Sequence, residues 1–208
     1  YSGSRGLGDV YKRQNLIYRF TVIDSPDINA FALPGGYIFI NRGLMAYLSS
    51  EEELAAVLGH EIGHVTARHS VRQYSQSQLM GILSTAVEIN AGRTAGNIAN
   101  LASGALLSGY GRDMELEADD LGAQYIFQEG YSPQGMFEVL SVLKDQEIYS
   151  KKVAEERGQE PRSYHGVFAS HPSNDLRLQE VLNNVSVSFK EGKKKEKDNY
   201  LNMIEGMV

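Results

Sequence analysis

The chain has 208 residues, which is enough for one domain with a hydrophobic core. It carries 20 basic and 26 acidic residues, and the resulting net charge of −6 argues against general binding to nucleic acids. There are no cysteines, so disulfide scaffolds, thiol nucleophiles and thiolate zinc sites are excluded. Because no uninterrupted apolar stretch of about 18 residues occurs, the sequence predicts no transmembrane helix.

The two ends of the chain differ in composition from its middle. Residues 1–14 are polar and glycine-rich, lack the apolar stretch of a signal peptide, and are interpreted as a poorly ordered, foreign or truncated leader. Residues 191–208 include the charge run EGKKKEK, which is typical of a solvated C-terminal tail, here interpreted as the start of a truncated extension. The sequence therefore predicts one folded domain over 15–190.

Three short runs near the start of that domain predict a small sheet. The runs at 16–23, 29–33 and 37–40 are rich in β-branched and aromatic residues, and the turn residues SPD and PGG separate them. Because the connections between the runs are short, we expect the strands to pair antiparallel.

The rest of the domain is predicted to be mainly helical, which gives an α+β fold. Ser50 can cap a helix with Glu53 as its capping-box partner, and this helix is expected to continue to about Tyr74. Residues 81–109 predict a helical hairpin, with a mobile flap or a membrane-facing segment as the alternative. Further helices are expected at 115–128, 133–149 and 172–183, with a charged loop at 151–163.

The sequence His60-Glu61-Ile62-Gly63-His64 is an HExxH motif within the first predicted helix. Residues four apart share one helix face, so the imidazoles of His60 and His64 can bind the same metal ion. Glu61 lies one step round the helix, where it can act as general base toward a water molecule that the metal activates. A surface helix with two unrelated histidines is the alternative, and the predicted cap and helix argue against it.

Two histidines leave a zinc site one protein ligand short. The extended pattern HExxHxxGxxH does not apply, because Ala67 and Ser70 occupy the positions of its glycine and last histidine. His69 follows His60 by nine residues, which on a continuous helix places it about 180° away, so we interpret it as an ordinary helix-end residue. His165 is expected on a surface loop and is given no role.

The run RDMELEAD at 112–119 offers the missing ligand. Glu115 and Asp119 share one helix face, so Glu115 can bind the metal while Asp119 accepts a hydrogen bond from the second ring nitrogen of a ligating histidine. Glu117 lies about 200° from Glu115 and is expected to point elsewhere. An acidic first turn that favours the helix dipole is the alternative explanation for part of this run.

Several sequence blocks, in this order, resemble the M48 family of zinc metallopeptidases and, within it, the BepA-like soluble periplasmic branch. They are NAFALPGGYIFINRGL at 29–44, EEELAAVLGHEIGHVTARH at 51–69, RDMELEAD at 112–119, GYSP at 130–133 and SHPSNDLR at 170–177. Residues 1–14 resemble nothing in the family. The membrane helices of its prenyl-protein protease branch are missing, which disfavours that branch.

The resemblance implies a zincin-type domain of the gluzincin class, in which the edge strand of the small antiparallel sheet flanks the HExxH helix. It implies that the first Glu of ExxAD, Glu115, holds one Zn²⁺ together with the two motif histidines. It also implies that His171 lies near the metal, either to stabilise the oxyanion or to occupy the open ligand position, and that Arg177 helps to orient this loop. From the residues alone, His171-Pro172 is equally well explained as a cap and turn.

The predicted edge strand consists of Asn29, Ala30, Phe31, Ala32 and Leu33. An extended peptide could add to its free edge through backbone hydrogen bonds, which suits a protease with broad or misfolded substrates. A purely structural edge strand is the alternative.

The sequence thus predicts a zinc-dependent endopeptidase of the bacterial periplasm or cell envelope. Its expected role is protein quality control, with polypeptide substrates that include misfolded envelope proteins. Nucleic acid is not expected as a partner, and residues 81–109 are a candidate for peripheral membrane contact. The alternative is a zinc-stabilised, chaperone-like or assembly-platform protein whose protease activity is latent or self-inhibited.

Overall fold

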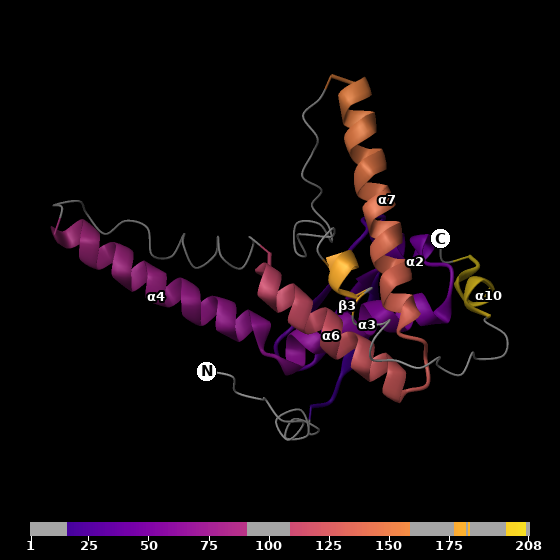
Figure 1. Ribbon diagram of the computed structural model, residues 1–208, viewed down its shortest axis with the longest axis horizontal. Helices are drawn as coiled ribbons and strands as arrows, with labels where there is room; N and C mark the ends of the chain where they lie inside the picture. Colours follow the sequence, from indigo (N-terminus) through magenta and orange to yellow (C-terminus); the bar gives the residue numbers. More distant parts are fainter. Residues whose placement is uncertain (1–15, 91–108, 159–176, 182, 184–198, 207–208) are drawn as a thin grey trace.

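The computed structural model describes residues 16–90, 109–158, 177–181, 183 and 199–206 (Figure 1). Within these ranges the chain is mainly helical with one small sheet, which confirms the predicted α+β class. The expected leader, His165, His171, residues 91–108 of the expected hairpin and the charge run of the tail lie outside the described residues.

The sheet contains β1 (Arg19–Ile23), β2 (Ala30–Leu33) and β3 (Tyr37–Asn41) in the order β1-β3-β2. β2 and β3 pair antiparallel as expected, but β1 and β3 pair in parallel, so the expectation of a purely antiparallel sheet is wrong. Short connections reverse the direction of consecutive strands, as predicted. However, β3 lies between β1 and β2, and two strands separated by two reversals run the same way.

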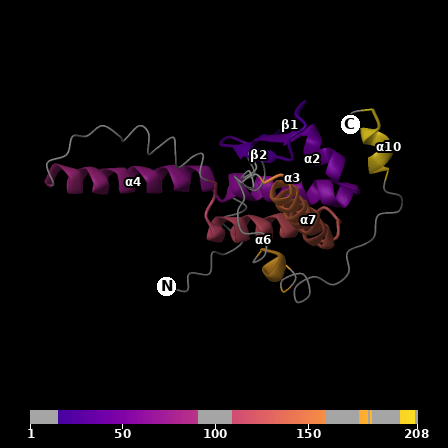
Figure 2. The same cartoon turned by 90° about the horizontal axis from the view of Figure 1, so that it is seen from above.

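The helices form two layers on one side of the sheet (Figure 2). α3 (Glu51–Thr66) contacts β2 and β3 on one side and α6 (Arg112–Gln128) and α7 (Gln134–Glu156) on the other. α4 (His69–Asn90) extends away from this body, and α2 (Arg42–Tyr47) follows the sheet (Figure 1). Among the helices that the structure describes, none is long and apolar enough to cross a bilayer.

The start of α3 is fixed by the predicted cap. The Ser50 hydroxyl oxygen accepts a hydrogen bond from the Glu53 amide at 3.1 Å. The Glu53 carboxylate in turn accepts from the amide of Ser49 at 2.6 Å, one residue before the usual capping-box partner. Glu51 and Glu52 complete an acidic first turn, which is favourable at the positive end of the helix dipole.

The end of α3 differs from the prediction. The helix stops at Thr66, Arg68 adopts a left-handed conformation with φ of 54°, and α4 begins at His69. A residue in this conformation commonly terminates an α-helix, so the single helix expected to reach Tyr74 is instead two helices with different directions. This break determines where His69 lies.

Other boundaries also shift. α6 starts at Arg112 rather than Glu115, and α7 continues to Glu156, so the charged loop expected from Lys151 is helical in its first part. Neither α2 nor α10 (Tyr200–Ile204) was predicted. α10 packs on the main core through two buried side chains, and its Tyr200 hydroxyl donates a hydrogen bond to the Met45 carbonyl at 2.7 Å.

The main core lies between the sheet, α2, α3, α7 and α10. Its members include Ile40, Leu44, Ala56, Met136 and Leu140, all of which are nearly inaccessible to solvent. A smaller apolar cluster of Ala32, Ile38 and Val65 packs the inner face of β2 and β3 against α3. Both cores therefore hold α3, and with it the HExxH motif, in one orientation.

α3 and α6 approach each other so closely that their backbones touch. A Cβ atom on Gly63 would lie 2.8 Å from the Ala118 carbonyl oxygen, and one on Gly122 would lie 2.8 Å from the His60 amide nitrogen. Such distances are too short for real side chains, so glycine is required at both positions for this packing.

We therefore predict that Gly63→Ala destabilises the domain. The added methyl group would push α6 away from α3, at a cost of about 1–3 kcal/mol in the free energy of unfolding, although alanine is the better helix former. The same substitution at Gly111, where nothing lies within 4 Å of an added Cβ, should cost less than about 1 kcal/mol. Denaturant unfolding of both variants is the measurement, and equal losses would contradict the proposed contact.

Candidate metal centre

Three buried donor groups from two helices meet at one point. The Nε2 atoms of His60 and His64, one turn apart on α3, are 2.9 Å from each other. The Glu115 carboxylate on α6 places one oxygen 3.5 Å from His60 Nε2 and the other 3.6 Å from His64 Nε2. In the part of the chain that the structure describes, this is the one cluster of histidine and acidic residues suited to a metal ion.

The spacing of these donors fits a tetrahedral ion. Two ligands at ~2.1 Å from such an ion lie ~3.4 Å from each other, and the donor separations of 2.9–3.6 Å bracket this value. A set of two imidazoles and one carboxylate is also the donor set of many catalytic zinc sites, which keep a further position open. The residues present therefore fit a single divalent metal.

Glu61 lies directly next to this cluster on α3. Its side chain is 2% exposed, and together with His60 and Arg177 it lines a small cavity of about 30 Å³ between α3, β2 and α7. This is the glutamate position of an HExxH motif on a helix, from which a carboxylate can act as general base.

Asp119 and Arg177 lie next to Nδ1 of His60, the ring nitrogen that does not face Glu115. Asp119 Oδ1 lies 2.8 Å from His60 Nδ1, and the Arg177 guanidinium donates two hydrogen bonds of 2.7 Å to the same carboxylate. Burial raises the pKa of Asp119, but the charge of Arg177 and the hydrogen bonds from Arg177 and His60 together outweigh this effect, so the net shift is downward. Arg177 also ion-pairs with Glu115 at 3.0 Å, so it neutralises charge on two acidic groups of the site.

The acidic surroundings also affect His60. Burial and Arg177 lower the pKa of its imidazole, whereas the hydrogen bonds and charges of Asp119 and Glu115 raise it more strongly, so the net shift is upward. The centre therefore has a local excess of negative charge that favours a cation.

His69 lies against His64, so the expectation that it faces away from the site is wrong. Its side chain is fully buried, and its Nδ1 is 2.7 Å from His64 Nδ1. The angular argument failed because α3 ends before His69, and the turn at Arg68 brings the chain back toward His64. Glu117 points away from the three donors, as expected, and contacts His69 and Arg72 instead.

Tyr110 was not singled out from the sequence. Its ring stacks on the His64 imidazole with a centroid distance of 4.1 Å, and its hydroxyl is 2.7 Å from the Ser70 hydroxyl. A tyrosine just before the acidic helix is the only signal in the sequence, and nothing in its spacing indicates a contact with a residue 46 positions earlier.

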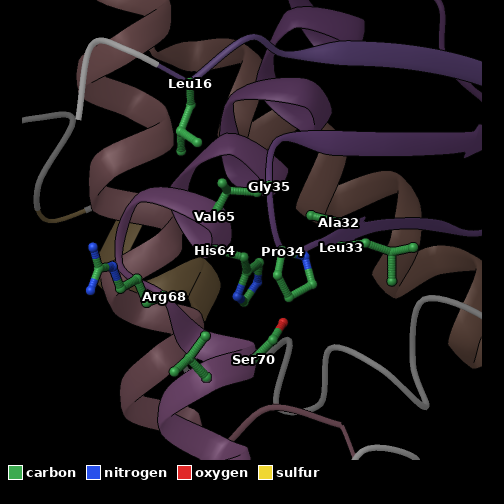
Figure 3. Close-up of a pocket in the computed structure, with 10 residues that line it drawn as sticks. Leu16, Ala32, Leu33, Pro34, Gly35, His64, Val65, Arg68 and Ser70 are labelled. Carbon is green, nitrogen blue, oxygen red and sulfur yellow. The ribbon is translucent and has the colours of Figure 1, made fainter.

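A cleft of about 380 Å³ runs between the sheet and the junction of α3 and α4 (Figure 3). Ala32, Leu33 and Pro34 line its sheet side, and His64 and Ser70 line its helical side. β2 is an edge strand of the sheet, so its outer edge has no partner strand among the described elements. The cleft thus connects the predicted edge strand with a residue of the donor cluster.

Comparison with known proteins places the chain in a family. The family model described as peptidase family M48 matches residues 8–185. The chain belongs to peptidase family M48. It is 33% identical over 178 residues to the beta-barrel assembly-enhancing protease of Yersinia pestis and 28% identical over 174 residues to the metalloprotease YcaL of Escherichia coli, covering 80% of this chain in each case. A mitochondrial metalloendopeptidase OMA1 of Arabidopsis thaliana is 31% identical over 58% of this chain.

The match covers only part of the length of each of these relatives. The match covers 34% of the Yersinia protein, 62% of YcaL and 24% of the Arabidopsis protein. The chain thus spans about a third of the length of the beta-barrel assembly-enhancing proteases that it matches.

We predict that the buried Arg177 stabilises the metal-free M48 domain strongly. Arg177→Met should lower the free energy of unfolding by about 3–5 kcal/mol, because Asp119 and Glu115 would remain buried without this cation. Arg42→Met is the matched control, since Arg42 forms a solvent-exposed pair with Asp24 and should contribute less than about 1 kcal/mol. Denaturant unfolding in the presence of a chelator is the measurement, and similar losses in the two variants would be incompatible with this role.

Proposed function

We propose that this M48 domain is a zinc-dependent endopeptidase with one Zn²⁺ held by His60, His64 and Glu115. The observation that carries the proposal is the convergence of these three buried donors beside a cleft that follows an edge strand. When bound, zinc supplies a Lewis acid that polarises a carbonyl group and lowers the pKa of water. The absence of cysteine leaves nitrogen and oxygen donors to hold it, a set typical of catalytic rather than structural zinc.

Glu61 is the proposed general base and acid. It accepts a proton from the attacking water as the new carbon–oxygen bond forms at the scissile carbonyl. It then delivers this proton to the leaving amine as the carbon–nitrogen bond breaks, so that the products are a carboxylic acid and an amine. His171, predicted from the family resemblance, is the candidate for stabilising the oxyanion or filling the open ligand position. Asp119 and Arg177 keep His60 in its orientation.

The proposed substrate is an extended polypeptide that lies in the cleft along β2. Residues 29–33 would pair with it through their backbone, a mode that recognises main chain more than side chain. The side chains of Leu33, Val65 and Val71 give the cleft an apolar lining that suits unfolded segments. If β2 has a purely structural role instead, no substrate would pair with its outer edge.

The biological setting is proposed from the relatives. The relative from Yersinia pestis is named a beta-barrel assembly-enhancing protease, which favours misfolded or unassembled envelope proteins as substrates and the bacterial periplasm or envelope as the location. Peripheral membrane contact through 81–109 stays a prediction, since most of this segment lies outside the described residues. The alternative of an assembly platform with latent activity is less well supported, because Glu61 is present beside a complete donor set.

Glu61→Gln should keep zinc at one ion per chain and lose activity on casein by about 10²–10⁴-fold, because the amide cannot carry the proton. Zinc content by atomic emission and digestion kinetics are measured on the same sample. Glu129→Gln, on the exposed end of α6, is the control and should behave as the unmodified protein. Full casein cleavage by a zinc-loaded Glu61→Gln variant would disprove the assignment.

Glu115→Gln should weaken zinc binding by more than about 100-fold, since it removes the anionic ligand while keeping the size of the side chain. Competition with a chromophoric chelator measures the affinity, again with Glu129→Gln as the control. In the unmodified protein, a strong chelator should abolish casein cleavage and added zinc should restore it. Unchanged zinc affinity in Glu115→Gln would exclude Glu115 as the third ligand.

A further inference from the structure

Each histidine of the donor cluster is connected through hydrogen bonds to a carboxylate and an arginine, but the route of the connection differs between the two. His60 contacts the Asp119 carboxylate directly, and Arg177 binds that carboxylate. His64 instead contacts another histidine: its Nδ1 lies 2.7 Å from the Nδ1 of His69. The remaining members of this second route are Glu117 and Arg72, which lie behind His69.

The second route is continuous from the buried centre to the protein surface. His69 Nε2 lies 3.3 Å from Glu117 Oε2, and Arg72 Nη1 donates a 2.7 Å hydrogen bond to the same oxygen. The side chain of His69 is fully buried, whereas those of Glu117 and Arg72 are about one third exposed. His69 and Arg72 lie one turn apart at the start of α4, so the turn at Arg68 places both of them behind His64.

The positions of the protons follow from this geometry. If His64 offers Nε2 to the metal, its Nδ1 carries the hydrogen and donates it to His69. His69 must then accept at Nδ1 and carry its own hydrogen on Nε2, which points at the Glu117 carboxylate. This is the one arrangement of a neutral His69 in which both of these contacts are hydrogen bonds.

We propose that His69 is a positioning residue for His64, and that Glu117 and Arg72 fix the tautomer and orientation of His69. The inference rests on the proposed zinc centre. The ring of His69 meets that of His64 edge to face at a centroid distance of 4.8 Å, so it limits rotation of the ligand as well as fixing its proton. Partners of this kind around metal-binding histidines commonly affect metal affinity by 10–100-fold.

The test compares two substitutions in the full chain. His69→Phe keeps a ring of similar size and removes both hydrogen bonds, whereas His69→Asn keeps an acceptor near the position of Nδ1. We expect His69→Phe to weaken zinc binding by about 10–100-fold and His69→Asn to restore it to within about fivefold of the unmodified protein. The affinity is measured by chelator competition, and unfolding in the presence of chelator shows whether each variant is folded.

A second measurement does not depend on any variant. Long-range proton–nitrogen correlation spectra of the zinc-loaded protein should show the hydrogen of His69 on Nε2 and that of His64 on Nδ1. A His69 ring protonated at Nδ1, or a folded His69→Phe variant with unchanged zinc affinity, would overturn the inference.

The outcomes separate this inference from the proposed function. If Glu115→Gln weakens zinc binding but His69→Phe does not, the zinc centre stands and the role of His69 is wrong. If the unmodified protein binds no zinc, or Glu115→Gln binds it equally well, both proposals fail. Glu117→Gln, which removes the charge but keeps an acceptor for His69, should change zinc affinity by only a few fold.

Discussion

The site depends on the direct backbone contact between α3 and α6. Gly63 lies inside the HExxH motif and touches Ala118, one turn after Glu115 on α6. A glycine within a helix costs about 1 kcal/mol relative to alanine, so the motif gives up local helix stability for this approach. In return, the short side chain of a glutamate reaches across to both histidines. A larger residue at this contact would move α6 away from α3. Glu115 would then move away from the histidines, whereas His60 and His64 would keep their spacing on α3.

Charge explains why this arrangement suits a divalent cation. Glu61, Glu115 and Asp119 are all nearly inaccessible to solvent, and Arg177 provides one positive charge among them. With these acids ionised and the histidines neutral, the group carries a formal charge of about −2, which is costly to bury. A divalent metal would balance it, whereas without metal the same field raises the pKa of His60. The energetics of the fold and the binding of metal are therefore coupled.

The parts of the site that the sequence could predict are those set by a single helix. A spacing of four residues correctly predicts that His60 and His64, and likewise Glu115 and Asp119, share one helix face, because each pair lies within an unbroken helix. His69 was misplaced because one left-handed residue, Arg68, resets the direction of the chain, and an arginine carries no strong signal for that conformation. The parallel pairing of β1 with β3 and the packing of α10 on α2 depend on contacts distant in sequence, which no local pattern encodes.

The edge strand and the donor cluster are held in register by the same helix. α3 presents Val65 to Ala32 of β2 on one side, while its neighbour His64 lines the cleft and belongs to the donor cluster. A peptide that paired with β2 would therefore be positioned relative to His64 through a single rigid element rather than through a loop. Of the three donors, His64 is the one that lines this cleft, although its side chain is almost inaccessible to solvent. In the proposed arrangement, contact with His69 limits movement of the His64 ring. The ring of His60 is instead held by the Asp119 carboxylate, which Arg177 binds.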